Sequence, residues 1–284
     1  MSVARAAIVL LALVAPLLSG FRTERAALGP SPRVRIPAGH FDRGSDTAAV
    51  HHALALCDKE HRFSSSLGHC DASLFSAELP YVRVYVPSFE IDRLEVTRAE
   101  YARCTRAGAC PPPHLGAGDD RIGRPTHPVV GVSAHDAEDY CRFVGGRLPS
   151  DDEWEKAARG DLDARNFPWG DLFDPKLANH GGAEGSEAGD HAPFLAPVGS
   201  YPDGASPYGV FDLAGNVWEW TSSAFTPGMR VRPAEAGGAV RTIRGGSFKS
   251  SAMMLRVSYR VGLASVEYAP DLGFRCAYDL FGPG

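Results

Sequence analysis

The segment Gly209-Val-Phe-Asp-Leu-Ala-Gly-Asn-Val-Trp-Glu-Trp220 constrains the fold of this chain more than any other. Its glycines allow the backbone to turn where a side chain would clash. Asp212, Asn216 and Glu219 supply side-chain oxygens, and a turned backbone adds carbonyl oxygens, which together are the ligands that Ca²⁺ requires. The alternative is a tight turn before a strand, in which the carboxylates only cap backbone N–H groups.

The surrounding region, from Gly160 to Gly238, is rich in Gly, Pro, Asp and Asn. A structureless connection of this length is uncommon in a compact domain. Embedded aromatic side chains indicate instead an ordered, coil-rich region, and bound metal ions would fix it. Among these aromatic residues are Phe167, Trp169, Phe194, Tyr201, Tyr208, Phe211, Trp218 and Trp220.

Three helix starts share one signature, a Ser or Thr followed three residues later by an acidic residue. The signature predicts helices that open at Thr97, Ser133 and Ser150 and end at Gly108, Gly145 and Gly160. Before them, the alternation in Tyr81–Pro87 predicts a half-buried strand that Phe89–Glu95 continues. Val34–Gly44 is typical of an opening strand and turn.

The first residues are typical of an export signal. Arg5 precedes the apolar run Ala6–Leu18, which is too short to span a bilayer comfortably. We therefore predict a signal peptide over residues 1–20, a linker over 21–33 and one domain over 34–280, with an uncleaved anchor as the alternative. We expect a periplasmic or extracellular protein with no membrane span after signal removal.

Six cysteines follow this signal, and export makes disulfides the expected use for them. Cys104 and Cys110 flank a short loop, Cys57 and Cys70 share an insertion, and Cys141 and Cys276 remain as the third pair. The insertion also contains histidines, so a zinc site is the alternative for its two cysteines. These histidines are His51, His52, His61 and His69.

The charge balance bears on the kind of partner. The formal net charge is −5, from 34 acidic and 29 basic side chains, and no basic stripe is present. We therefore do not expect nucleic acid as a partner.

Four further motifs accompany the Gly209–Trp220 segment. They are Arg147-Leu-Pro-Ser-Asp-Asp-Glu-Trp-Glu-Lys-Ala-Ala-Arg159, Phe167-Pro-Trp-Gly170, Arg244-Gly-Gly-Ser-Phe248 and Gly273-Phe-Arg-Cys276. In this order and spacing they resemble the domain of the formylglycine-generating enzyme, also called the sulfatase-modifying-factor family. The resemblance covers Val34–Tyr278, and it also supports the pairing of Cys141 with Cys276.

The resemblance implies an α+β, C-type lectin-like fold with little regular structure, stabilised by Ca²⁺. It implies two calcium positions. The one nearer the C-terminus would use the side chains of Asp212 and Glu219 and the carbonyls of Gly215 and Val217. The other would use the side chains of Asn179 and Asp190 and the carbonyls of His180 and Ala192.

Enzymes of this family bind Cu(I) through a pair of cysteines shortly after the Gly-Gly-Ser motif and oxidise a substrate cysteine to formylglycine. At those positions this chain has Ser250 and Leu255, and no cysteine occurs between Gly246 and Arg275. Because Cu(I) requires soft sulfur ligands, we expect no copper and no catalytic residue there. Met253 and Met254 do not replace the pair, because adjacent residues of a strand point to opposite faces.

Two hypotheses of function follow. The chain is either an exported, calcium-stabilised module that binds a peptide, glycan or protein, or an oxidase or tailoring enzyme of altered chemistry. Some exported relatives without the cysteine pair are associated with oxidative tailoring of secreted metabolites. The residues that would line such a cleft are Ser247, Lys249, Ser250, Arg256, Tyr259 and Arg260. The alternative, which we favour for Arg244, Arg260 and Arg275, is pairing with buried carboxylates.

Overall fold

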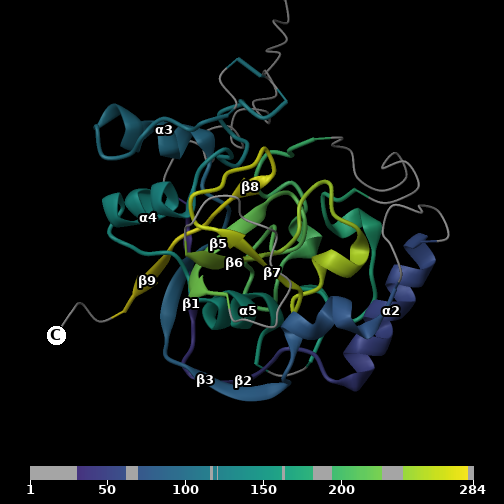
Figure 1. Ribbon diagram of the computed structural model, residues 1–284. Coiled ribbons are helices and arrows are strands. Elements are labelled where there is room, and N and C mark those ends of the chain that lie inside the picture. Colours follow the sequence, from purple (N-terminus) through teal and green to yellow (C-terminus); the bar gives the residue numbers. More distant parts are fainter. Residues whose placement is uncertain are drawn as a thin grey trace, which may run out of the picture.

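Three small β-sheets and four α-helices, joined by long coil segments, make up the described part of the chain (Figure 1). The computed structural model describes residues 31–61, 70–115, 118–119, 121–161, 164–181, 194–225 and 239–280. The predicted signal peptide and most of the predicted linker lie outside these ranges. Within them, no helix is both long and apolar enough to cross a membrane.

The first and last strands of the domain share a sheet. Strand β1 (Arg33–Ile36) pairs with β4 (Phe89–Asp92), and β4 pairs on its other side with β9 (Ala277–Asp279), both antiparallel. The predicted strand over Tyr81–Pro87 is confirmed as β3 (Val82–Val86), which pairs with β2 (Gly39–Arg43).

The third sheet carries the segment with which the sequence analysis began. Its order is β7-β6-β5-β8, and only the β5–β8 pairing is parallel. Its strands are β5 (Trp218–Ala224), β6 (Val240–Arg244), β7 (Arg260–Ala264) and β8 (Leu272–Gly273). Strand β5 thus lies within the region from Gly160 to Gly238 that was predicted to be coil-rich.

The three predicted helices are confirmed, each with a complete capping box. They are α3 (Arg98–Arg106), α4 (Ala134–Phe143) and α5 (Asp151–Arg159). In each, the Ser or Thr accepts from the backbone three residues on, and the acidic side chain there bonds back to the cap. Helix α5 ends at Gly160, which has a φ of 86°.

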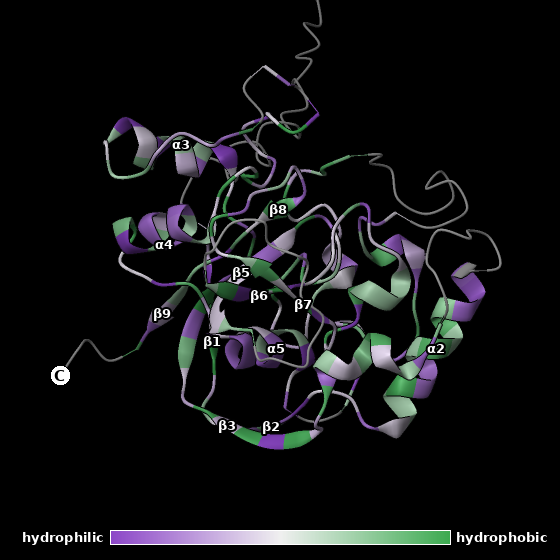
Figure 2. Cartoon of the chain, in the orientation of Figure 1, coloured by the Kyte–Doolittle hydropathy of each residue, from purple (hydrophilic) through white to green (hydrophobic). Residues whose placement is uncertain are grey.

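Helix α2 (Thr47–His61) was not predicted, and it lies across the molecule from α3 and α4 (Figure 1). It mixes hydrophobic and hydrophilic residues along its length (Figure 2). Met253 and Met254, expected on a strand, lie in the short 3₁₀ helix η6 (Ala252–Leu255), which packs against α2. Met253 is buried in the larger apolar cluster, and the partly buried Met254 packs against that cluster.

Two apolar clusters carry most of the packing. The larger joins the buried face of α4 (Ala137, Tyr140 and Cys141) to β5 and the C-terminal segment. The second surrounds Trp154 of α5 and includes Ile36 and Val257. The described coil segments also contain the short 3₁₀ helices η2 (Ala72–Glu78), η3 (Pro175–Leu177) and η5 (Pro202–Gly204).

Candidate functional site

The carboxylate of Glu219, on β5, is bound from two sides in the interior. Arg275 donates from Nε to Oε2 at 2.8 Å and from Nη2 to Oε1 at 2.7 Å. The indole Nε1 of Trp154 donates to Oε2 at 2.8 Å. All three residues are buried, and Arg275 also donates to the carbonyl of Phe211. Oε1 of Glu219 thus accepts one hydrogen bond from described residues, which leaves it a lone pair.

Two more buried carboxylates lie in the field of the same guanidinium. They belong to Glu95, just before α3, and to Asp212. Burial raises the pKa of Glu95 well above its ordinary value, and the charges of Asp212 and Glu219 raise it further. Burial also raises the pKa of Asp212 to about 6. When ionised, the three carboxylates carry more charge than the Arg275 guanidinium neutralises.

Asn216 connects this group to Asn179. The Asn179 amide nitrogen donates to Oδ1 of Asn216 at 3.0 Å, and the Asn216 backbone N–H donates to the Asn179 carbonyl at 2.8 Å. The Asn216 amide nitrogen donates to Oε2 of Glu95 at 2.7 Å. Oδ1 of Asn179 is buried and has no partner among the described residues. One side-chain oxygen in this network is therefore left without a donor.

The backbone around Asn216 is in an uncommon conformation. Asp212 and Asn216 have φ values of 56° and 59°, in a left-handed region that residues other than Gly rarely adopt. A Cβ on Gly215 would lie 2.1 Å from the carbonyl oxygen of Asn179, so this position requires glycine. Such strained positions persist where the surrounding contacts fix them, and they are frequent at ligand sites.

The predicted calcium ligands are thus described only in part. Asp212, Gly215, Val217 and Glu219 lie together in the Gly209–Trp220 turn, and Asn179 and His180 lie in the chain that packs on it. Asp190 and Ala192 lie outside the described residues. Among the residues described, no three His, Cys, Asp or Glu side chains converge as a metal site would require. Only Asp212, Asp190 and Glu219 would bind through carboxylates in the predicted positions; the other predicted ligands are carbonyl or amide oxygens.

The positions of the family's cysteine pair are occupied by two unlike side chains. Ser250 is 4% exposed, and its hydroxyl accepts from the backbone N–H of Ser247 at 2.9 Å. Leu255 is 0% exposed and packs in an apolar cluster with Phe167 and Ala214. One position therefore holds a loop together and the other fills the core.

Beside Ser250, a polar group reaches the surface. The Ser247 hydroxyl donates to Oδ2 of Asp271 at 2.9 Å, and Nζ of Lys249 lies 3.5 Å from Oδ1 of the same carboxylate. The Lys249 side chain is 51% exposed. Sequence analysis did not identify Asp271, which lies 24 positions from Ser247.

The six residues expected to line a cleft do not share a surface. Except for Lys249, they are buried: Ser247, Ser250, Arg256, Tyr259 and Arg260. Arg256 forms an ion pair with Glu78, which also accepts from the hydroxyls of Ser45 and Ser258. Arg256 and Arg260 therefore do not line a surface cleft, because carboxylates in the interior bind them.

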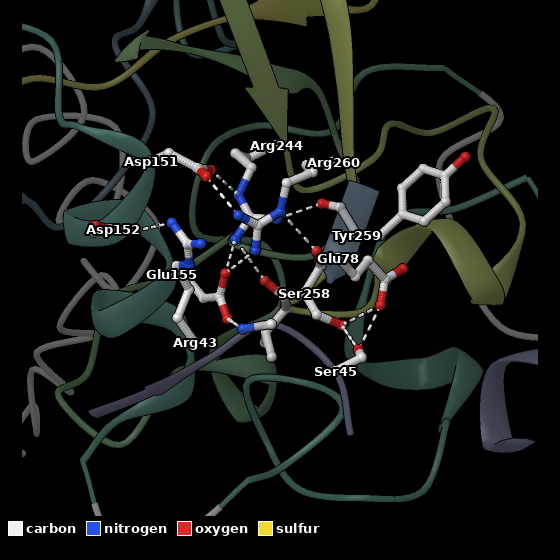
Figure 3. Close-up of polar contacts among 12 residues, drawn as sticks. Arg43, Ser45, Glu78, Asp151, Asp152, Glu155, Arg244, Ser258, Tyr259 and Arg260 are labelled. Atoms are coloured by element: carbon white, nitrogen blue, oxygen red, sulfur yellow. Dashed lines mark hydrogen bonds and ion pairs between the residues drawn. The ribbon is translucent and has the colours of Figure 1, made fainter. Parts of the chain in front are cut away.

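Figure 3 shows the side chains of Arg244 and Arg260 converging on Asp151 and Glu155 of α5. Nη1 of Arg260 lies 2.5 Å from Asp151, and Nη2 of Arg244 lies 2.6 Å from Glu155. Burial opposes ionisation of Glu155, but Arg260, Arg159 and Arg244 outweigh it and lower its pKa to about 2. The expected pairing of these arginines with buried carboxylates is confirmed, as it is for Arg275 with Glu219.

All six cysteines form disulfides in the predicted pairs. The bonds join Cys57 to Cys70, Cys104 to Cys110, and Cys141 to Cys276, and no cysteine is free. The zinc alternative for the insertion is therefore wrong, because the thiolates it needs are oxidised. His69 lies outside the described residues, as does the His61 side chain. Three disulfides are compatible with an oxidising compartment.

Comparison with known proteins agrees with the resemblance. A family model for the "Sulfatase-modifying factor enzyme 1-like domain" matches residues 23–280. The chain is 40% identical to the inactive C-alpha-formylglycine-generating enzyme 2 of Mus musculus, over 53% of this chain and 48% of that protein. It is 41% identical to the formylglycine-generating enzyme of Streptomyces coelicolor, over 58% of this chain and 56% of that protein. The chain thus spans about half the length of these relatives.

A hercynine oxygenase of Mycolicibacterium smegmatis is 32% identical over 87% of this chain and 61% of its own length. Among solved structures, PvdO from Pseudomonas aeruginosa matches 87% of this chain and 94% of its own, with a TM-score of 0.63 and 25% identity. CarF matches 89% and 99%, with a TM-score of 0.60 and 17% identity. These likenesses confirm the predicted fold class.

Proposed function

The chain belongs to the family of sulfatase-modifying factor enzyme 1-like domains, and from this premise we propose that it is an exported, calcium-stabilised binding module without copper–thiolate oxidase chemistry. The observation that carries the proposal is that the chain has no free thiol to bind copper. Every cysteine is in a disulfide, and the positions of the family's thiolates hold a hydrogen-bonded Ser250 and a buried Leu255. A hydroxyl and an aliphatic side chain do not hold Cu(I).

The interior charge supports the calcium part of the proposal. When ionised, Glu95, Asp212 and Glu219 together carry more charge than Arg275 neutralises, and Oδ1 of Asn179 has no donor among the described residues. A divalent cation at the position nearer the C-terminus would supply positive charge to these carboxylates, and one at the other position would supply a partner for the Asn179 oxygen. The available donors are carboxylate, amide and carbonyl oxygens, which are hard ligands of the kind Ca²⁺ prefers.

The disulfides support export, because such bonds persist in oxidising compartments and are rare in the cytosol. Under this proposal the module binds a peptide, a glycan or a partner protein. The half-exposed Lys249, with Asp271 beneath it, is the surface-reaching part of the polar group next to Ser250.

The decisive experiment compares this protein with an active relative. Full-length protein from an oxidising compartment is loaded with Cu(I) and incubated in air with a Cys-x-Pro-x-Arg peptide, and the peptide is analysed by mass spectrometry. The formylglycine-generating enzyme of Streptomyces coelicolor, treated identically, is the positive control. We expect aldehyde only in the control, and copper-dependent aldehyde from this protein would overturn the proposal.

A second candidate function is oxidative tailoring by altered chemistry. It is favoured by the Ser247–Asp271–Lys249 group, which connects the position of the lost cysteine pair to the surface. Metal analysis of the purified protein separates the candidates. Calcium without a redox metal supports the binding module, whereas iron or copper bound at unit stoichiometry supports the enzyme.

A further inference from the structure

The two-stranded sheet of β2 and β3 presents aromatic side chains to solvent. Tyr81 and Tyr85 are 38% and 56% exposed, and the nearby Leu79 is exposed as well. Three large exposed side chains within seven residues of chain form a patch, which differs from the single exposed apolar residues that are normal on a surface.

Polar side chains of both strands lie in the same patch. The register pairs His40 with Tyr85 and Asp42 with Arg83. The rings of His40 and Tyr85 meet edge to face at 5.2 Å, and Nη1 of Arg83 lies 3.7 Å from Oδ1 of Asp42. Burial raises the pKa of the Tyr81 hydroxyl, and the charge of Asp42 and a hydrogen bond to it raise it further, so Asp42 also faces Tyr81. We call these five residues the outer face.

The opposite side of the same strands is fixed to the protein interior. Phe41 and Val86 are buried in the apolar cluster around Trp154. Nζ of Lys156, on α5, donates to the carbonyl of Gly39 at 3.0 Å. Figure 1 shows β2 and β3 at the lower edge of the molecule, below α5. The outer face is therefore held on a rigid support and remains open to solvent.

The size of the outer face limits what it can bind. Two paired strands of five residues measure about 17 Å by about 10 Å. A stable protein–protein interface buries about 800 Å² on each partner, several times that footprint. The outer face is thus too small for a folded protein partner, whereas a short chain molecule fits it. Tyr81 and Tyr85 are separated by four residues, or about 13 Å along the strand, so such a ligand meets both rings only if it has more than one unit.

The charges of the outer face indicate the chemistry of the ligand. Arg83 and Asp42 carry opposite charges, so neither an anion nor a cation is favoured over the other. At 3.7 Å their contact is too long for a hydrogen bond, which leaves the guanidinium able to donate and the carboxylate able to accept. A ligand hydroxyl both donates and accepts, so it matches this pair. The tyrosine rings add apolar area with a polar tip.

We propose that the outer face binds a neutral oligosaccharide. The apolar C–H faces of its sugar rings stack on Tyr81 and Tyr85, and its hydroxyl groups exchange hydrogen bonds with the Arg83–Asp42 pair between them. The inference rests on the binding part of the proposed function and names the class of ligand.

The test is isothermal titration calorimetry of the full-length protein with three neutral oligosaccharides, cellohexaose, chitohexaose and mannohexaose. A heparin hexasaccharide is the anionic comparison. We expect at least one neutral oligosaccharide to bind, with an affinity that changes little with salt because the ligand carries no charge to be screened.

Variants then locate the binding. Tyr85→Ala is expected to weaken it by about tenfold or more, and Tyr85→Phe, which keeps the ring, by much less. Tyr268→Ala is the matched control, because Tyr268 is an exposed tyrosine outside the outer face. Urea denaturation checks that each variant folds. If Tyr85→Ala does not fold, Tyr81→Ala takes its place with the same expected loss.

The outcomes separate the inference from the proposed function. Oligosaccharide binding that persists unchanged in both Tyr81→Ala and Tyr85→Ala overturns the role of the outer face and leaves the binding module intact. Binding of heparin alone, lost at high salt, overturns the neutral ligand class. Self-association that Tyr85→Ala abolishes assigns the face to a second copy of the chain and overturns the inference. An absence of all oligosaccharide binding also overturns it, while the proposed function, which includes peptide and protein ligands, stands.

Discussion

At the scale of single residues, the interior is stabilised by charge to an unusual extent. Arg244, Arg256, Arg260 and Arg275 are almost completely buried, and each binds a buried carboxylate. Removing such groups from water costs several kcal/mol per ion, and only good pairing offsets that cost. Loss of one partner is therefore more harmful than loss of both.

The substitution Glu155→Gln tests this directly. It leaves Arg244 and Arg260 with one buried carboxylate between them, that of Asp151, and we expect the free energy of unfolding to fall by about 3–5 kcal/mol in urea denaturation. Glu90→Gln is the control, because Glu90 forms a partly exposed pair of 3.8 Å with Arg33 and should cost at most about 1 kcal/mol. Equal costs for the two variants would contradict the argument.

Asp92 gives the stability of the protein a pH dependence. Burial raises its pKa to about 7, although it accepts hydrogen bonds from the Cys276 N–H and the Tyr278 hydroxyl. Between about pH 4 and pH 7 the folded state therefore holds a proton that the unfolded state has released, so stability falls as pH rises through this window.

In Asp92→Asn this proton is absent, and we expect the slope of unfolding free energy against pH to change by up to about 1.4 kcal/mol per pH unit between pH 4 and pH 7. Urea denaturation across that range is the measurement. Parallel curves for the variant and the unmodified protein would show that Asp92 titrates normally.

At the scale of elements, the sequence predicted a helix wherever the capping side chain and its backbone partner are only three residues apart. The capping boxes at Thr97, Ser133 and Ser150 gave three helices nearly to the residue. Helix α2 was missed because its cap is incomplete. Asp46 accepts from the N–H of Ala49 at 2.8 Å, but Ala49 has no carboxylate to return the bond. Asp46, an N-cap residue without an acidic residue three positions later, was the only local sequence signal by which α2 could have been predicted.

The disulfides differ in the length of chain that they close, and so in their expected effect. Cys141–Cys276 closes 135 residues and Cys104–Cys110 closes 6. Replacing the first pair with alanine should lower the free energy of unfolding by roughly 5 kcal/mol, and replacing the second by roughly 2 kcal/mol, in the chain-entropy model. Urea denaturation of the two double variants measures the difference. A larger loss from the short bridge would reject this account.

At the scale of the whole molecule, the motifs predicted the family, the fold class and the disulfides, but not which carboxylates the buried arginines bind. Glu95 lies 121 positions from Asn216, and Glu78 lies 178 positions from Arg256. No periodicity connects such residues, because only the folded chain brings them together. The carboxylates that bind Arg256 and Arg260 in the interior are likewise distant from them in sequence, so the sequence could not show that these two side chains point inward.

Calcium removal tests the proposed function at this scale. A ligand present at 100 times its Kd adds about 2.7 kcal/mol to stability, and for a domain of this size that corresponds to a Tm change of about 5–10 °C. We expect a chelator to lower Tm by that amount and added Ca²⁺ to restore it. Mg²⁺, which demands a smaller octahedral site, should restore little. An unchanged Tm would remove the calcium part of the proposal.

The pairing of β4 with both β1 and β9 has a consequence for biogenesis. The first sheet lacks its third strand until Ala277–Asp279 has been made, and Arg275 reaches Glu219 only at the same moment. A chain that lacks these residues is thus unable to close its interior, so the domain cannot complete its folding before its last strand is present.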